Sequence, residues 1–294
     1  MRLLGAMGNQ TSSTLQDLDQ YLQSIYSTAA NDIASQHGET LQQIADYDEA
    51  QYSYIQDERQ RRMQIYMSVL QNESAAFWKI AAIIAAAGLV ACNRIRDASA
   101  VTLEQSYRLT IGGFQQQLGS NAPQWWNYLP REELRSRIQE SAFTRVAFNR
   151  LGYDSNLAQR RIMQRLRTQM MGSILAGEGV DGLMARVRAI TRSSYYDARR
   201  ITRTELMRCA NQGRYEAAQQ AYRDYGIRAR KIWIHTPTAI TPRDDHIAMN
   251  GVAAGEDGYF TLPNGERALY PLDPNLSAEQ SIHCSCTFVC EVIL

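Results

Sequence analysis

The first third of the chain places its apolar side chains with helical periodicity. After the polar start Thr11–Thr14, apolar residues recur at alternating steps of three and four: Leu15, Leu18, Leu22, Ile25 and Ala29. This spacing is typical of one coiled-coil-like helix face. Glycine is a poor helix former, so we expect this helix to end at His37-Gly38. A second helix is then expected from Glu39 to about Glu73.

The most apolar stretch runs from Ala75 to Cys92 and is interrupted by Lys79. The 13 residues from Ile80 to Cys92 are uncharged, whereas a membrane-spanning helix needs ~20. We therefore expect a buried, alanine-rich helix and no membrane contact. Alanine also lets helices approach closely, so an oligomer contact is the alternative for this stretch.

The remaining pattern changes from helical to extended along the chain. After a break at Ile111-Gly112-Gly113, helices are expected at 131–151, 156–175, 182–193 and 194–225. Short β runs follow at 232–235, 259–262 and 287–290. The predicted fold is mainly α, with an elongated N-terminal and central helical region before a small α+β C-terminal domain. We place the three parts at 1–100, 101–200 and 201–294.

Charge is distributed unevenly over these parts. Residues 1–100 carry a net charge of −4, residues 101–230 one of +10 and residues 231–294 one of −5, although the whole chain carries only +1. All basic residues of the middle part are arginines, whose planar fork suits phosphate and carboxylate groups. Four of them fall on one predicted helix: Arg160, Arg161, Arg165 and Arg167. They are candidates for sequence-independent contact with double-stranded DNA, and a solvated basic helix face is the alternative.

A series of short motifs in the last hundred residues carries a family resemblance. It begins with Arg203-Thr204-Glu205 and Asn211, continues through Thr241–His246 and Pro271–Pro274, and ends with His283-Cys284-Ser285-Cys286. In order and spacing this series resembles the C-terminal domain of the phage Mu protein F-like minor head proteins. Two runs depart from the family pattern. Thr238–Arg243 lacks an acid and an arginine, and His283 and Ser285 replace the residues that usually flank the first cysteine.

Arg203, Glu205 and Asn211 are predicted to form a structural polar network. Residues two apart on a helix do not face each other, so Arg203 and Glu205 must reach different partners. Such partners would hold this helix against the small C-terminal fold. We favour this interpretation over catalysis.

His246, Cys284 and Cys286 are candidate zinc ligands. Thiolate and imidazole groups suit zinc, and four ligands would close a structural tetrahedron. The fourth ligand is left open among His235, His283, Asp245 and Cys290. The five cysteines are odd in number, with three inside seven residues, which does not fit an extracellular disulfide framework. Reduced, buried cysteines beside a hydrogen-bonded histidine are the alternative without metal.

The resemblance implies a minor capsid protein in head morphogenesis at the portal vertex. Its expected partners are the portal protein and other capsid proteins. We expect the chain to be oligomeric in the virion and to be present in the host cytoplasm during assembly. Packaged DNA is a further expected contact. The enzymatic alternative is a metal-dependent hydrolase or toxin-like effector. A third hypothesis for the function is an internal virion protein that is ejected with the genome. We expect no enzyme, because the sequence shows no HxxxH pattern and no nucleophile elbow.

Overall fold

The computed structural model describes residues 2–46, 52–124, 126–236 and 242–293. The side chains of residues 2–11 and 45 lie outside this description. So does the segment 238–241, which holds most of the run in which the sequence departs from the family pattern.

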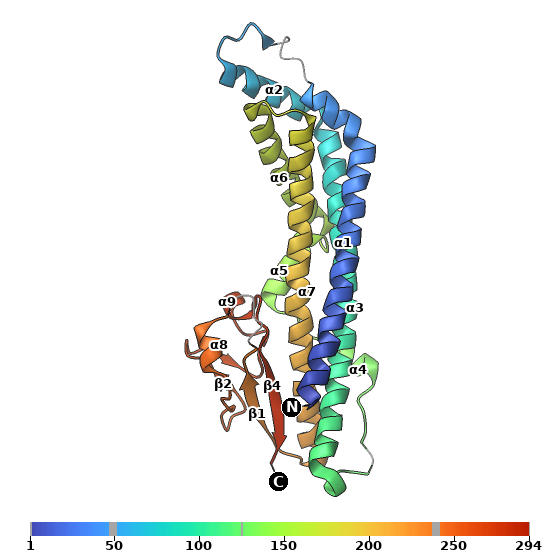
Figure 1. Cartoon of the computed structure of the whole chain (residues 1–294), viewed down its shortest axis with the longest axis vertical. Helices are drawn as coiled ribbons and strands as arrows, with labels where there is room; N and C mark the ends of the chain where they lie inside the picture. The colour runs from blue at the N-terminus through green and yellow to red at the C-terminus, as the bar shows by residue number, and fades with distance from the viewer. Residues whose placement is uncertain (1, 47–51, 125, 237–241, 294) are drawn as a thin grey trace. The chain divides into compact units, whose positions relative to one another are not determined.

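The fold class predicted from the sequence is confirmed: long helices precede a small region of short antiparallel strands (Figure 1). The helices of this first part are α1 (Arg2–Ala45), α2 (Glu58–Asn72), α3 (Ser74–Leu118), α4 (Arg131–Ser136), α5 (Ala142–Leu151), α6 (Ser155–Ala176) and α7 (Val180–Tyr225). A 3-10 turn, η2 (Gly119–Asn121), follows α3. The C-terminal module contains β1 (Ala229–Ile234), α8 (Asp244–Ala248), β2 (Phe260–Thr261), β3 (Arg267–Ala268), α9 (Ala278–Ser281) and β4 (Thr287–Val292).

The chain divides into two compact units, and α1, α3, α5 and α7 contribute to both. Unit 1 comprises Met1–Leu18, Arg94–Arg145 and Arg200–Leu294, and unit 2 comprises Asp19–Asn93 and Val146–Arg199. Unit 1 therefore contains the C-terminal module together with the parts of α3 and α7 that pack against it. Unit 2 is wholly helical in its regular structure.

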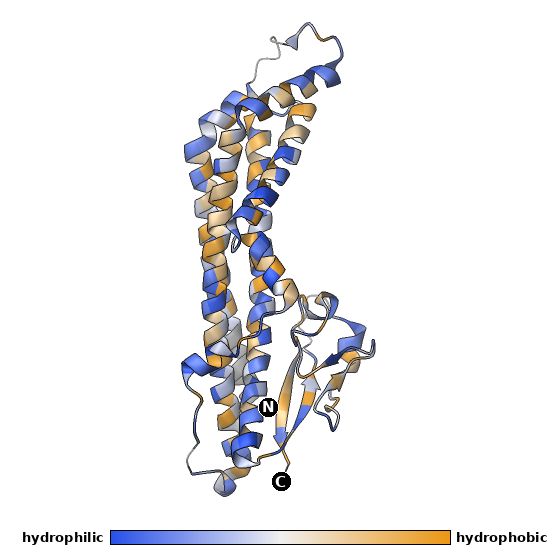
Figure 2. Cartoon of the chain, turned by 180° about the vertical axis from the view of Figure 1, so that it is seen from behind, coloured by the Kyte–Doolittle hydropathy of each residue, from blue (hydrophilic) through white to orange (hydrophobic). Residues whose placement is uncertain are grey.

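Unit 2 has an aliphatic core between its helices. Its fully buried side chains include Leu41 of α1, Ile84 of α3, Leu166 of α6 and Ile190 of α7. A glycine allows a close backbone approach here, since a Cβ added at Gly88 would lie 1.9 Å from the carbonyl oxygen of Leu151. Figure 2 shows hydrophobic and hydrophilic residues interspersed along these helices, as expected when one face of each helix is buried.

The predicted helix end at His37-Gly38 is wrong. Helix α1 runs through both residues to Ala45, because the buried stripe continues beyond them with His37, Leu41 and Ile44. A mid-helix glycine costs only about 1 kcal/mol, which this burial offsets. The second helix therefore begins at Glu58, where Asp57 caps it by accepting a hydrogen bond from the Gln60 N–H at 2.6 Å.

Three other predicted helix bounds also need correction. Helix α3 continues through Gly112-Gly113, because Ile111 and Phe114 are buried on its inner face. Helix α7 is one helix where two were expected. The predicted helix 131–151 is two helices, because α4 ends at Ser136 and α5 begins after Ser141. The Ser141 Oγ accepts a hydrogen bond from the Thr144 N–H at 3.2 Å.

The apolar stretch that begins near Ala75 belongs to the long helix α3. Of the helices that the structure describes, the segment Ser74–Asn121 is the one long and apolar enough to cross a membrane by length and composition. Half of its most apolar window is buried inside the protein. The buried side chains include Phe77, Ile80 and Ile84.

The C-terminal module of unit 1 is built on two short antiparallel pairs. Strand β1 pairs with β4 from Ala229 opposite Val292 to Ile234 opposite Thr287, and β2 pairs with β3. Trp233, Phe260 and Phe288 form the centre of its core, with the Trp233 and Phe260 rings 5.3 Å apart and edge to face. This core fixes the ends of β1 and β4, beside which the candidate ligands lie.

Candidate metal centre

The register of the β1–β4 pair brings His235 and Cys286 together. Ile234, the last residue of β1, lies opposite Thr287, the first residue of β4. His235, which directly follows β1, and Cys286, which directly precedes β4, are therefore neighbours. His235 Nδ1 lies 3.7 Å from the Cys286 sulfur.

The short helix α8 supplies His246 from a different direction. Its ring is 2% exposed and meets the Trp233 ring edge to face at 5.5 Å. His246 Nδ1 lies 3.4 Å from the Cys284 sulfur and 3.5 Å from the Cys286 sulfur. The ligand atoms of His246, Cys284 and Cys286 all lie within 4.8 Å of one another, so this buried group could hold a metal ion.

The two thiols share their polar environment. Cys284 donates a hydrogen bond to Cys286, and this contact, with help from His246 and His235, lowers the pKa of Cys286. The same contact and burial raise the pKa of Cys284. The Cys284 sulfur also accepts the Cys286 N–H at 3.3 Å. One thiolate is thus favoured in the pair, and a bound cation would favour the second by replacing its proton.

The other fourth-ligand candidates have different surroundings. Cys290 lies among hydrophobic side chains of the module, where burial raises the pKa of its thiol to about 12. Asp245 accepts a hydrogen bond from Gln280 Nε2 at 3.2 Å. His283 has a left-handed backbone, with φ of 61°, and burial followed by three nearby arginines lowers its pKa. Of these four candidates, all of which lie within the described residues, His235 is the one whose side chain contacts the thiol pair.

Helix α7 holds this part of the module through Asn211, which is fully buried. Asn211 Nδ2 donates to the carbonyl oxygens of Pro271 at 2.9 Å and Cys286 at 3.0 Å. Its Oδ1 accepts from Arg214 at 2.8 Å and from the Thr287 hydroxyl at 2.9 Å. Two turns earlier, Arg203 donates to the Ser285 hydroxyl at 2.9 Å. Both residues therefore contact the strand segment that carries the cysteines.

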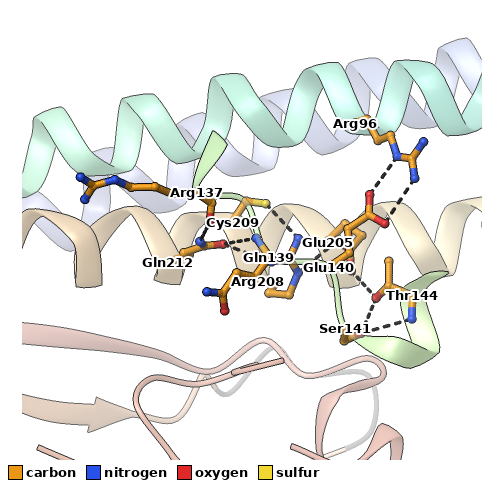
Figure 3. Close-up of polar contacts among 10 residues, drawn as sticks. All are labelled: Arg96, Arg137, Gln139, Glu140, Ser141, Thr144, Glu205, Arg208, Cys209 and Gln212. Carbon is orange, nitrogen blue, oxygen red and sulfur yellow. Dashed lines mark hydrogen bonds and ion pairs between the residues drawn. The ribbon is translucent and has the colours of Figure 1, made fainter. Parts of the chain in front are cut away.

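Glu205 points to a different partner, within a buried polar network (Figure 3). Its carboxylate forms an ion pair with Arg208 at 2.7 Å, in which the side chains are 3% and 2% exposed. The other carboxylate oxygen accepts the Thr144 hydroxyl at 2.7 Å. Arg208 also donates to Gln212 at 3.2 Å, and Gln212 in turn binds the backbone carbonyl of Arg137 in the interruption between α4 and α5.

Arg208 and Gln212 were not among the predicted site residues. The spacing of Glu205 and Arg208, three residues apart on a helix, is a local signal for their ion pair. Thr144 and the carbonyl of Arg137 lie more than sixty residues away in sequence, so no local signal could identify them.

The four predicted DNA-contacting arginines of α6 divide into two kinds. Arg161 lies 3.7 Å from Asp197 of α7, and Arg165 donates to Ser193 of the same helix. These two are interhelix contacts. Arg160 and Arg167 are exposed. Two of the four arginines of the predicted basic face thus make packing contacts within unit 2, and the other two are exposed.

Comparisons with known proteins add one partial relative. No family model and no solved structure matches this chain. The chain is 29% identical over 91 residues to the uncharacterized protein YqbB of Bacillus subtilis strain 168. The match covers 30% of this chain and 28% of YqbB. The chain thus matches less than a third of the length of this curated relative, and the resemblance to minor head proteins stays a prediction.

Proposed function

We propose that this chain is a structural protein of head assembly in a tailed phage, and that one zinc ion closes its C-terminal module. One observation carries the proposal: the motif residues contact one another and the backbone of the module. Asn211 holds the Cys286 carbonyl, Arg203 holds Ser285, and His246 faces the two cysteines. Residues used in this way stabilise a fold, as an assembly protein requires.

The donor set supports zinc as the metal. Zinc held tetrahedrally at ~2.3 Å from sulfur and ~2.0 Å from nitrogen separates a sulfur from a nitrogen by about 3.5 Å. The nitrogen–sulfur distances here are 3.4, 3.5 and 3.7 Å. Two thiolates and two imidazoles are soft and intermediate ligands that favour zinc over magnesium or calcium. His235, His246, Cys284 and Cys286 would make four ligands, which is the closed form of a structural site.

The same geometry argues against the hydrolase alternative. A catalytic zinc site keeps one coordination position open for water or substrate. Here His246, Cys284 and Cys286 are each 2% exposed, and His235 is available for the fourth position. A metal in this place would therefore contribute folding free energy and would not present a water molecule to a substrate.

The proposed partners follow from the head-assembly role. They are the portal protein and other capsid proteins, with the chain located inside the capsid or at the portal vertex. Contact with packaged DNA would use exposed cations, of which Arg160 and Arg167 are two. Such contacts neutralise phosphates without reading the base sequence.

Quantitative mass spectrometry of purified particles tests the head-assembly role. Particles produced by the genetic element that encodes this chain should contain it at a constant ratio to the portal protein and at far lower copy number than the major shell protein. Nuclease and high-salt washing should not remove it. Particles that assemble, package DNA and contain none of this chain would overturn the proposal.

A further inference from the structure

Unit 2 contains a cavity of about 420 Å³ between α1 and α7. Helix α7 contributes Arg188, Arg192 and Arg199, together with Tyr195 and Tyr196. Helix α1 contributes Gln23, Tyr26, Ser27 and Ala30 to the opposite side. The volume falls within the range of about 300–1,000 Å³ that small-molecule sites occupy.

The positive charge of this cavity is compensated at one end only. Arg199 forms an ion pair with Asp19 at 3.0 Å, and Asp19 also accepts the Tyr195 hydroxyl at 2.8 Å. Arg188 is eleven residues from Arg199, about 16 Å along the helix. No carboxylate among the described residues forms an ion pair with Arg188 or Arg192. An anionic ligand is therefore favoured at that end.

The arginines are accompanied by an aromatic surface. Arg192 lies over the Tyr196 ring, 5.6 Å from its centroid, and donates to the Tyr196 hydroxyl at 3.2 and 3.3 Å. Tyr196 is 46% exposed, so part of its ring is open to a ligand. Guanidinium groups bind phosphate oxygens in a bidentate manner, and exposed aromatic rings stack on nucleobases. The combination suits a phosphate that carries a flat ring.

The geometry points to a phosphate-ester site in this cavity, one that binds a nucleotide unit, either free or within a nucleic-acid strand. Arg188 and Arg192 hold the phosphate, and Tyr196 supports the base. The predicted arginines of α6 are not part of the cavity, since Arg161 and Arg165 contact α7 at Asp197 and Ser193. The site belongs to unit 2 alone, so it does not depend on the head-assembly role or on zinc.

Fluorescence anisotropy on the full chain tests this site. The probes are a labelled single-stranded 12-mer, the corresponding labelled duplex, and fluorescently labelled ATP. The double variant Arg188→Gln/Arg192→Gln is compared with Arg145→Gln/Arg150→Gln, which removes the same charge from exposed positions of α5, outside both the cavity and the predicted DNA-contacting arginines. Circular dichroism melting verifies that both variants are folded.

We expect the cavity variant to bind the strand at least tenfold more weakly than the wild type, and the α5 variant to bind it less than threefold more weakly. The slope of log affinity against log salt should fall by about two in the cavity variant. Binding of labelled ATP without binding of the single strand or the duplex would assign the site to free nucleotides. Equal loss of affinity in both variants would show that overall charge, and not the cavity, accounts for binding, and would overturn the inference. A wild-type chain that binds none of the three probes would overturn it as well.

Discussion

The side-chain amide of Asn211 donates a hydrogen bond to the backbone carbonyl of Cys286 at 3.0 Å. This bond joins helix α7 to the candidate metal ligand that directly precedes strand β4. Because the same amide also binds Pro271, one side chain connects three segments of unit 1. The arrangement explains why a polar side chain occupies a fully buried position on this helix.

Replacement of Asn211 should therefore destabilise unit 1. We expect Asn211→Ala to lower the free energy of unfolding by about 2–4 kcal/mol, because it leaves two buried carbonyl groups without their donor. Urea unfolding followed by circular dichroism measures the change. Gln219→Ala, at an exposed position of the same helix, is the control and should change stability by less than about 0.5 kcal/mol. Equal effects of the two variants would contradict a connecting role for Asn211.

The Glu205–Arg208 pair should respond differently to single and double replacement. Glu205→Gln leaves Arg208 charged and buried, and we expect it to cost about 3–5 kcal/mol. Glu205→Leu/Arg208→Met removes both charges and should recover more than half of that loss. The exposed pair Arg230–Glu291, in which the side chains are 57% and 52% exposed, provides the control. Glu291→Gln should cost less than about 1 kcal/mol, and a similarly small cost for Glu205→Gln would exclude the buried network as a source of stability.

Lys231 gives unit 1 a distinctive dependence on pH. Its ammonium group is buried and donates to the carbonyl oxygens of Gly258 at 2.7 Å and Leu269 at 2.6 Å. Burial lowers the pKa of Lys231 to about 8. Between this value and the ordinary lysine pKa near ~10.4, the unfolded chain binds more protons than the folded one, so folding becomes more favourable as pH rises.

The comparison of wild type with Lys231→Met isolates this effect. From pH 7.5 to 9.5, the free energy of unfolding of the wild type should rise relative to that of the variant by about 1–2 kcal/mol. Chemical denaturation at several pH values measures the difference. A difference that stays constant, or that falls as pH rises, would show that folding does not lower the pKa of Lys231.

The contact between Gly88 and Leu151 predicts opposite effects of two glycine replacements in unit 2. Gly88→Ala places a methyl group against the Leu151 carbonyl, and we expect it to lower stability by about 1–3 kcal/mol. Gly38→Ala, in helix α1, meets nothing within 4 Å and should raise stability by about 0.5–1 kcal/mol. Thermal melting of both variants measures the signs. A Gly88→Ala variant that is as stable as the wild type, or more stable, would contradict the close approach at Gly88.

The sequence predicts the helical elements better than their ends. The stripe of Leu18 and Leu22 identifies α1, but its continuation past Gly38 depends on the burial of His37 and Leu41, which periodicity around a glycine does not reveal. The break after Ser136 depends on Gln212, which binds backbone groups of that segment from α7. Such contacts are distant in sequence.

The candidate metal centre shows the same division between local and distant information. His246, Cys284 and Cys286 can be selected as candidates by residue type and motif spacing, because their chemistry is visible in the sequence. The selection of His235 as a fourth ligand requires the pairing of Ile234 with Thr287. Strand register is set by the whole module, through Trp233 and Phe288, and four candidates therefore remained open before the structure was known.

Zinc content of the purified full-length chain tests the central claim most directly. Elemental mass spectrometry should find close to one zinc per chain in the wild type and in Cys290→Ser, which removes a cysteine outside the group. Cys284→Ser and His246→Ala should lose the metal and melt at lower temperature. A wild-type chain that contains no zinc after purification from zinc-supplemented medium, or zinc that persists in Cys284→Ser, would contradict the proposed centre.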